Sequence, residues 1–285
     1  MRILLILVIA VGAIWAGAWW VITRDADAAT EALVAEMRDA GWEVRWDELR
    51  TRGFPSRIDT TATGLEIASP GGGFAYATER LQELRLLYRR ERAIFAAAPG
   101  NRLDVGRRSF DIEAEALRAS ADLLAGEVLD RVTLEAEALR TEGLAAEGIL
   151  AAMRPAAGVE HGYELYLSVE QLALGGAAPG PLTVDALVAF SGPLDRAALT
   201  APPRLERLQV RSLTYLPPEG DVRVSGIYER DADGRLAGEL GLEGEGLARV
   251  PDLLDALLPE LAAEVNAALP GEAVTVPLGA AAQRQ

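Results

Sequence analysis

The sequence contains no cysteine, no lysine and only 1 histidine in its 285 residues. Without cysteine, the chain cannot form a disulfide, a thiol nucleophile or a thiolate metal site. The single histidine, His161, cannot supply a multi-histidine metal centre, and no Gly-x-Ser-x-Gly motif supplies a serine nucleophile. We therefore expect no metal site, no cofactor and no catalytic residue, and the chain is predicted not to be an enzyme.

The charge of the chain is strongly one-sided. All 28 basic residues are arginine, and with 43 acidic residues the formal net charge is −15 at pH 7. An acidic surface repels the phosphates of nucleic acid, so no nucleic-acid partner is expected. The hydrophobic content of 50% is enough for a folded core and argues against disorder.

One long hydrophobic run lies at the start of the sequence. Residues 3–23 carry no charge, and a helix of this length spans about 31 Å, close to the hydrocarbon thickness of a bilayer. Three tryptophans gather towards the end of the run, where indole rings favour the membrane interface: Trp15, Trp19 and Trp20. With Arg2 on the cytoplasmic side, we predict a transmembrane anchor over residues 1–23 in the inner membrane and an exported, periplasmic domain over residues 24–285.

Two other interpretations of the hydrophobic run stay open. A cleaved signal peptide is one, with a small-residue cleavage site at residues 16–18 or 26–28. A buried core helix is the other. The anchor and the signal peptide both export the rest of the chain.

After the anchor, the hydrophobic pattern changes from helical spacing to alternation. A helix is expected over residues 25–40, ended by Gly41, and then a strand in which Trp42, Val44 and Trp46 share one face. Further alternating runs predict strands over residues 58–67, 74–78, 84–88, 110–115, 132–137, 163–169, 172–174, 184–190, 208–216, 222–228 and 236–242. An Asp-Gly turn between the last two runs indicates a hairpin.

Few helices are expected between these strands. The pattern predicts a short helix over residues 144–153, at most a turn over residues 196–200, and an amphipathic helix over residues 252–269 with a kink or break at Pro259. Many short strands with few helices predict a mainly β (α+β) fold. We expect a large curved antiparallel sheet of many short strands with a few packed helices, after an N-terminal transmembrane helix.

One pair of segments is distinctive enough to suggest a family. The sequence reads Gly-Trp-Glu-Val-Arg-Trp-Asp-Glu-Leu over residues 41–49 and Arg-Gly-Phe-Pro-Ser-Arg-Ile-Asp-Thr over residues 52–60. With the anchor before them, these segments resemble a bacterial membrane-anchored family called domain of unknown function 2125. The resemblance implies a topology and supplies no catalytic residues. The end of the chain, residues 277–285, is less strand-like than the resemblance implies, which predicts that a closing strand is missing.

The segment around Phe54 is the first candidate for contact with a ligand or partner. Gly53 permits a tight bend there, and Phe54 can fill the space where two strands meet. Arg57 and Asp59 alternate with Ile58, so they share one strand face and are expected to form a modest ion pair. The segment is interpreted as a structural corner, with a binding site around Phe54 and Arg57 as the alternative.

A cluster of arginines is the second candidate. Arg89, Arg90 and Arg92 form a dense basic spot in an otherwise acidic domain. Arginine forks suit the phosphate of a lipid headgroup or another anionic partner. The same residues also suit a charged sheet edge that resists aggregation, so both interpretations stay open.

Acidic side chains also recur on single strand faces, at Asp111, Glu113 and Glu115 and again at Glu135 and Glu137. Such a cluster can hold Ca²⁺ or supply an acid–base pair. The same alternation is what the solvated face of a half-buried sheet requires. We favour the solvated face.

These features predict a membrane-anchored, non-enzymatic periplasmic protein of the cell envelope. It is expected to contact the inner membrane through residues 3–23 and to bind a lipid, another hydrophobic ligand or an envelope partner protein. A pure protein-interaction scaffold is the alternative hypothesis, and a carboxylate-dependent hydrolase is the third.

Overall fold

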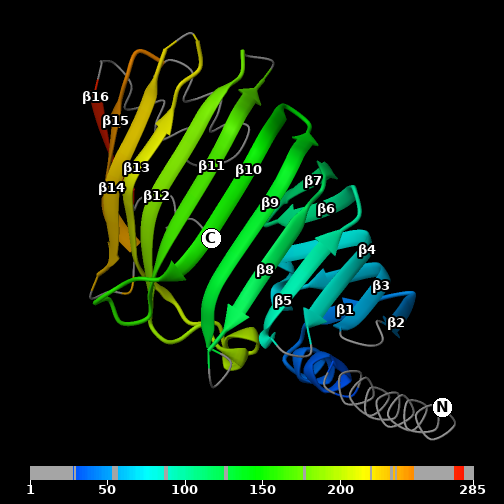
Figure 1. Ribbon diagram of the computed structural model, residues 1–285. Helices are drawn as coiled ribbons and strands as arrows, with labels where there is room; N and C mark the ends of the chain where they lie inside the picture. The colour runs from blue at the N-terminus through cyan, green and yellow to red at the C-terminus, as the bar shows by residue number, and fades with distance from the viewer. Residues whose placement is uncertain are drawn as a thin grey trace, which may run out of the picture. The chain divides into compact units, whose positions relative to one another are not determined.

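A computed structural model describes residues 28, 30–52, 57–86, 89–124, 128–175, 178–218, 220–231, 234, 236–246 and 273–278. The chain divides into two compact units between Ile112 and Glu113. The fold is mainly β, and within each unit the paired strands form antiparallel sheet (Figure 1). The predicted mainly β class, with an antiparallel sheet of many strands, is therefore confirmed for the described residues.

The first unit contains a helix over residues 30–39 and the strands that follow it. These are β1 (Glu43–Arg45), β2 (Glu48–Arg52), β3 (Arg57–Ala68), β4 (Phe74–Leu86), β5 (Arg89–Ala97) and β6 (Gly100–Val105), with a 3₁₀ turn η1 (Pro70–Gly72) between β3 and β4. Strands β1 and β2 both pair with β3, which pairs with β4, and β4 in turn pairs with β5 and β6. The long strands β3 and β4 thus organise this unit.

The second unit is an up-and-down series of neighbouring strands. They are β8 (Arg118–Leu123), β9 (Leu129–Thr141), β10 (Leu144–Pro155), β11 (Gly162–Leu174), β12 (Gly180–Phe190), β13 (Leu205–Tyr215), β14 (Val222–Arg230), β15 (Leu236–Glu243) and β16 (Ala273–Leu278), with a 3₁₀ turn η2 (Arg196–Leu199) before β13. Each strand from β8 to β16 pairs antiparallel with the next. Strand β7 (Arg108–Glu115) crosses the division, and its last residues pair with β9. The sheet of this unit is curved (Figure 1).

Most predicted strands are present, and several are longer than the alternation indicated. The runs over residues 163–169 and 172–174 are one strand, β11, whose register shifts between Val169 and Leu172. Both of these side chains are buried, whereas the two residues between them are exposed. This β-bulge explains why the sequence pattern divides at this point.

Two predictions about secondary structure are wrong. The short helix over residues 144–153 is strand β10, which pairs along its length with β9 and β11, so sheet pairing overrides the helix propensity of its alanines. The missing closing strand is also contradicted, because β16 pairs with β15 and includes Pro277 and Leu278.

The predicted anchor over residues 3–23 and the predicted helix over residues 252–269 lie outside the described residues. Among the residues that are described, no helix is both long enough and apolar enough to cross a membrane. The predicted helix over residues 25–40 is confirmed where it is described, and it ends before Gly41 as expected.

Buried side chains from five strands of the second unit pack into one hydrophobic cluster. Its members come from β10, β11, β13, β14 and β15: Ala146, Val169, Leu172, Tyr215, Val222 and Leu242. Partly buried side chains, including Leu167, Leu182 and Val224, pack against it. The cluster shows which face of these strands is the apolar one.

Candidate functional site

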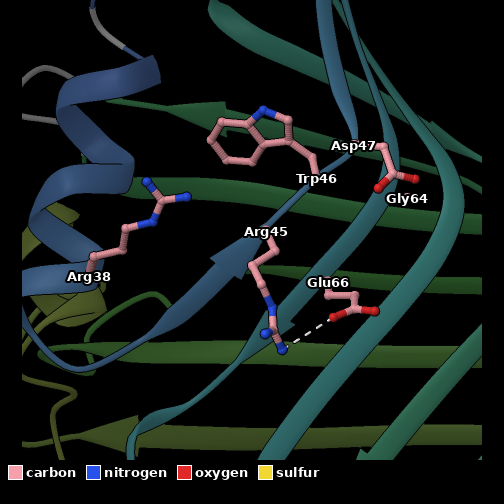
Figure 2. Close-up of a pocket in the computed structure, with 6 residues that line it drawn as sticks. All are labelled: Arg38, Arg45, Trp46, Asp47, Gly64 and Glu66. Atoms are coloured by element: carbon pink, nitrogen blue, oxygen red, sulfur yellow. Dashed lines mark ion pairs between the residues drawn. The ribbon is translucent and has the colours of Figure 1, made fainter.

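An open pocket of about 540 Å³ lies in the first unit, beside the end of the helix (Figure 2). Its lining comes from the helix, from β1 and the residues that follow it, and from β3: Arg38, Arg45, Trp46, Asp47, Gly64 and Glu66. Two arginines face two acidic residues, so the lining carries no net formal charge. The pocket is therefore a mixed polar surface with one aromatic ring.

Local sequence explains how the helix meets β1 at this pocket. Gly41 has a φ of +90°, which favours glycine, and the N–H groups of Gly41 and Trp42 donate to the carbonyls of Arg38 and Met37. This pair of bonds is a Schellman motif, which closes the C-terminus of a helix. It turns the chain so that Trp42, Val44 and Trp46 point to the buried side of β1, as the alternation predicts.

Three charged side chains of the pocket, Arg38, Arg45 and Glu66, are engaged with the backbone or in ion pairs. The Arg38 guanidinium donates to the carbonyl of Val44 at 2.6 Å and 3.2 Å and lies 5.3 Å from the ring centroid of Trp46. Arg45 forms 3.4 Å ion pairs with Glu43 and Glu66, all well exposed. These contacts join the helix to the sheet and leave the pocket a poor candidate for ligand binding.

Replacing Arg38 by alanine is expected to lower the free energy of unfolding of the first unit by about 1–2 kcal/mol, since two charged hydrogen bonds to the Val44 carbonyl and one cation–π contact are lost. Chemical denaturation followed by the fluorescence of Trp46 measures the change. Arg45→Ala is the matched control in the same pocket, with an expected loss of about 0.5 kcal/mol or less, because exposed ion pairs contribute little. If Arg38→Ala also lowers the free energy of unfolding by only about 0.5 kcal/mol or less, the Arg38 contacts do not stabilise the first unit.

Arg57, one of the predicted contact residues, begins β3. The Nε of Arg57 lies 2.8 Å from Oδ2 of Asp59, and the Asp59 side chain is 9% exposed. The expected ion pair is therefore present, with one partner buried. Register pairs Arg57 with Leu86 and Leu86 with Arg89, so Arg57 and Arg89 occupy one cross-strand row.

The other predicted contact residues are Arg90, Arg92 and Phe54. Arg90 follows Arg89 in β5, and Arg92 is partly buried farther along the same strand. Phe54 lies outside the described residues, as do the side chains of Arg89 and Arg90. Their contact with a ligand or partner stays a prediction.

The acidic residues singled out from the sequence do not form a metal site in the part of the chain that the structure describes. No group of three or more histidine or carboxylate side chains there is placed to hold a metal ion. Glu115 forms a 3.0 Å ion pair with Arg140 of β9 instead.

A second feature, which the hydrophobic pattern of single strands does not indicate, is the apolar face of the second unit. Strand register places two adjacent rows of side chains across β10 to β15 on the side of the hydrophobic cluster. We call these two rows the aliphatic strip: Ala151, Leu167, Val184, Leu213, Val224 and Leu242, then Met153, Leu165, Ala186, Val210, Gly226 and Leu240. None of these positions is charged or polar, and only Ala186 and Leu242 are fully buried.

Three tyrosines lie on the same face, beside the strip. The Tyr215 hydroxyl donates to the carbonyl of Leu172 at 3.0 Å, and the Tyr163 hydroxyl donates to the carbonyl of Leu129 at 3.3 Å. The Tyr228 hydroxyl is buried with no hydrogen-bond partner among the described residues. Burial raises the pKa of Tyr228 to about 12, so this hydroxyl keeps its proton at neutral pH.

The opposite face of these strands is polar and carries linked ion pairs. Arg154 lies 2.8 Å from Glu164, and Arg211 contacts both Glu164 at 3.4 Å and Asp185 at 3.3 Å. The hydrogen bond from Arg154 is the main reason that the pKa of Glu164 lies below its usual range. Leu150 and Tyr166 are exposed hydrophobic side chains on this face, at 38% and 44% exposure.

A family comparison agrees with the distinctive segments around β1 and β3. The profile of a family described as "Uncharacterized protein conserved in bacteria (DUF2125)" matches residues 19–284. The chain belongs to this family. The match extends through both units of this DUF2125 chain, so the resemblance over residues 41–60 is confirmed. No curated protein and no solved structure gives a significant match.

Proposed function

We propose that this DUF2125 chain is a non-enzymatic protein of the cell envelope that binds a lipid acyl chain against the aliphatic strip. In this proposal, residues 3–23 anchor it in the inner membrane, and the two units lie in the periplasm. The observation that carries the proposal is the strip itself: a continuous band of aliphatic side chains, across six neighbouring strands, that keeps part of its surface exposed.

The dimensions of the strip suit an acyl chain. Five inter-strand spacings of about 4.8 Å give a band about 24 Å long. One leaflet of a bilayer has a hydrocarbon layer about 15 Å thick, half of the usual 30 Å, so one extended acyl chain fits within the band. The contact is expected to stabilise binding through apolar area alone, at about 25 cal/mol for each Å² removed from water.

The chemistry of the strip favours an acyl chain over a protein partner. Protein interfaces are enriched in tyrosine, tryptophan and arginine, which supply hydrogen bonds as well as apolar area. The strip positions offer aliphatic side chains and one glycine, and the backbone groups of the paired strands are already engaged in the sheet. The net charge of −15 also disfavours adsorption to anionic headgroups, so the lipid is engaged through its chain.

Leu167→Asp is expected to weaken binding of a pyrene-labelled long-chain alkane to the full chain by at least tenfold, because a charge placed in the strip must stay solvated. Ser168→Asp is the matched control: its side chain lies on the opposite face of the same strand, and binding is expected to stay unchanged. Fluorescence titration measures both affinities, and far-UV circular dichroism checks that both variants fold.

A second measurement locates the ligand without introducing a charge. Because the chain has no cysteine, Ala151→Cys and Ala152→Cys each provide one thiol, on opposite faces of β10. Saturation with the alkane is expected to slow the reaction of a water-soluble maleimide severalfold at position 151 and not at position 152. No binding by the unaltered chain, or equal protection at both positions, contradicts the proposal.

A protein-interaction scaffold is the second candidate, and the exposed Leu150 and Tyr166 on the polar face favour it. The register places these two side chains on neighbouring strands. A photo-reactive amino acid at position 166 would then cross-link one stoichiometric envelope protein in native membranes, and the same group at position 167 would not.

A further inference from the structure

The Tyr228 hydroxyl is the one polar group at the aliphatic strip that the described residues leave without a partner. Tyr228 is 7% exposed, and its hydroxyl oxygen is buried. A buried hydroxyl without a hydrogen bond is costly, and such groups in native proteins call for an explanation. The paired hydroxyls of Tyr163 and Tyr215 show that this face otherwise satisfies its tyrosines.

Two glycines lie next to Tyr228 in the sheet. Gly226 precedes it on the same face of β14, and Gly238 lies directly across from it on β15. At either position a Cβ atom would lie within 2.2 Å of a backbone oxygen of the neighbouring strand, so both glycines are required there. Because neither glycine has a side chain, the ring borders the strip, of which Gly226 is a member.

The hydroxyl can act there only as a neutral donor or acceptor, since burial keeps it protonated. The partner that it lacks must be polar enough to form a hydrogen bond and uncharged enough to enter an apolar site. A carbonyl oxygen at the end of an acyl chain meets both conditions. An ionised fatty acid does not, because its carboxylate would lose its solvation.

We propose that the Tyr228 hydroxyl donates a hydrogen bond to the ester carbonyl of the bound lipid, so that the ligand class is an acyl ester and not a plain hydrocarbon. This inference rests on the proposed function and assigns the polar end of the same ligand. It also fixes the direction of the ligand, with the carbonyl at Tyr228 and the acyl chain along the strip.

The test compares two competitors of equal chain length that differ by one carbonyl group: a long-chain fatty acid methyl ester and the corresponding alkyl methyl ether. Each displaces the pyrene-labelled alkane from the full chain. The unaltered chain is expected to bind the ester about tenfold more tightly, which is the contribution of one buried hydrogen bond. Tyr228→Phe is expected to reduce this preference to about onefold while its affinity for the ether stays unchanged.

Tyr215→Phe is the matched control, because its hydroxyl already donates to Leu172 and is not free to bind a ligand. It is expected to keep the tenfold preference and to lower the melting temperature, whereas Tyr228→Phe in the absence of ligand is expected not to lower it. An ester preference that survives in Tyr228→Phe, or equal binding of ester and ether by the unaltered chain, overturns this inference and leaves the proposed function standing. Failure of both competitors and of the alkane to bind overturns the proposed function and this inference together.

Discussion

Gly180→Ala is expected to destabilise the second unit by about 3 kcal/mol or more. A Cβ atom at this position would lie 2.4 Å from the carbonyl oxygen of Leu216 and 2.5 Å from the Cα of Pro217. Both obstacles are backbone atoms, so a side-chain rotation cannot relieve the overlap, and β12 must move away from the loop after β13. Overpacking of this kind is among the most destabilising effects of a single substitution.

The positions of the tryptophans decide how this loss is measured. All five tryptophans lie at or before position 46, so the unfolding of the second unit is best followed by circular dichroism or by hydrogen exchange of its amides. Gly241→Ala is the matched control in β15, where a Cβ atom would meet nothing closer than 3.7 Å. Alanine there is expected to be neutral or to stabilise by up to about 1 kcal/mol, because glycine weakens a strand. Similar losses for both variants would show that the close approach at Gly180 is not a constraint.

The strands could be predicted well because alternation is a local signal. The runs over residues 222–228 and 236–242 became β14 and β15, and the Asp-Gly signal between them matches the bond from the Gly234 N–H to the carbonyl of Asp231. The alanine-rich β10 was misassigned because its strand character depends on pairing with β9 and β11. The hydrophobic pattern of residues 144–153 alone does not show this pairing. Gly148, with a φ of +63°, was the local signal against a helix there.

The candidate sites also differ in whether the local sequence reveals them. The pair of Arg57 and Asp59 was predictable because two residues of one strand face are two positions apart in sequence. The aliphatic strip was not predictable, because its rows combine residues such as Met153 and Leu240 that only the register of six strands brings onto one line. The Tyr228 hydroxyl without a hydrogen-bond partner is harder still to predict. It depends on the absence of a donor or acceptor on every described strand around it.

Arg57→Ala is expected to lower the free energy of unfolding of the first unit by about 2 kcal/mol. The reason lies with its partner: the Asp59 side chain is 9% exposed, and its Oδ1 has no hydrogen-bond partner among the described residues. Removing the guanidinium leaves a buried carboxylate without compensation, which costs more than the ion pair itself contributes. Because the Arg57 side chain is 57% exposed, the expected loss is smaller than for a fully buried ion pair. Denaturation followed by the fluorescence of Trp42 and Trp46 measures the loss.

Arg50→Ala separates this effect from that of an ordinary ion pair. Arg50 and Glu48 have the same spacing along β2 and a 2.6 Å contact, but both side chains are largely exposed, so a loss of about 0.5 kcal/mol or less is expected. Adding Asp59→Asn to Arg57→Ala is expected to recover at least about 1 kcal/mol, because the uncompensated charge is then absent. If Arg57→Ala is as mild as Arg50→Ala, the guanidinium is not needed by Asp59. The interpretation of Arg57 as a ligand contact would then be favoured over the structural corner.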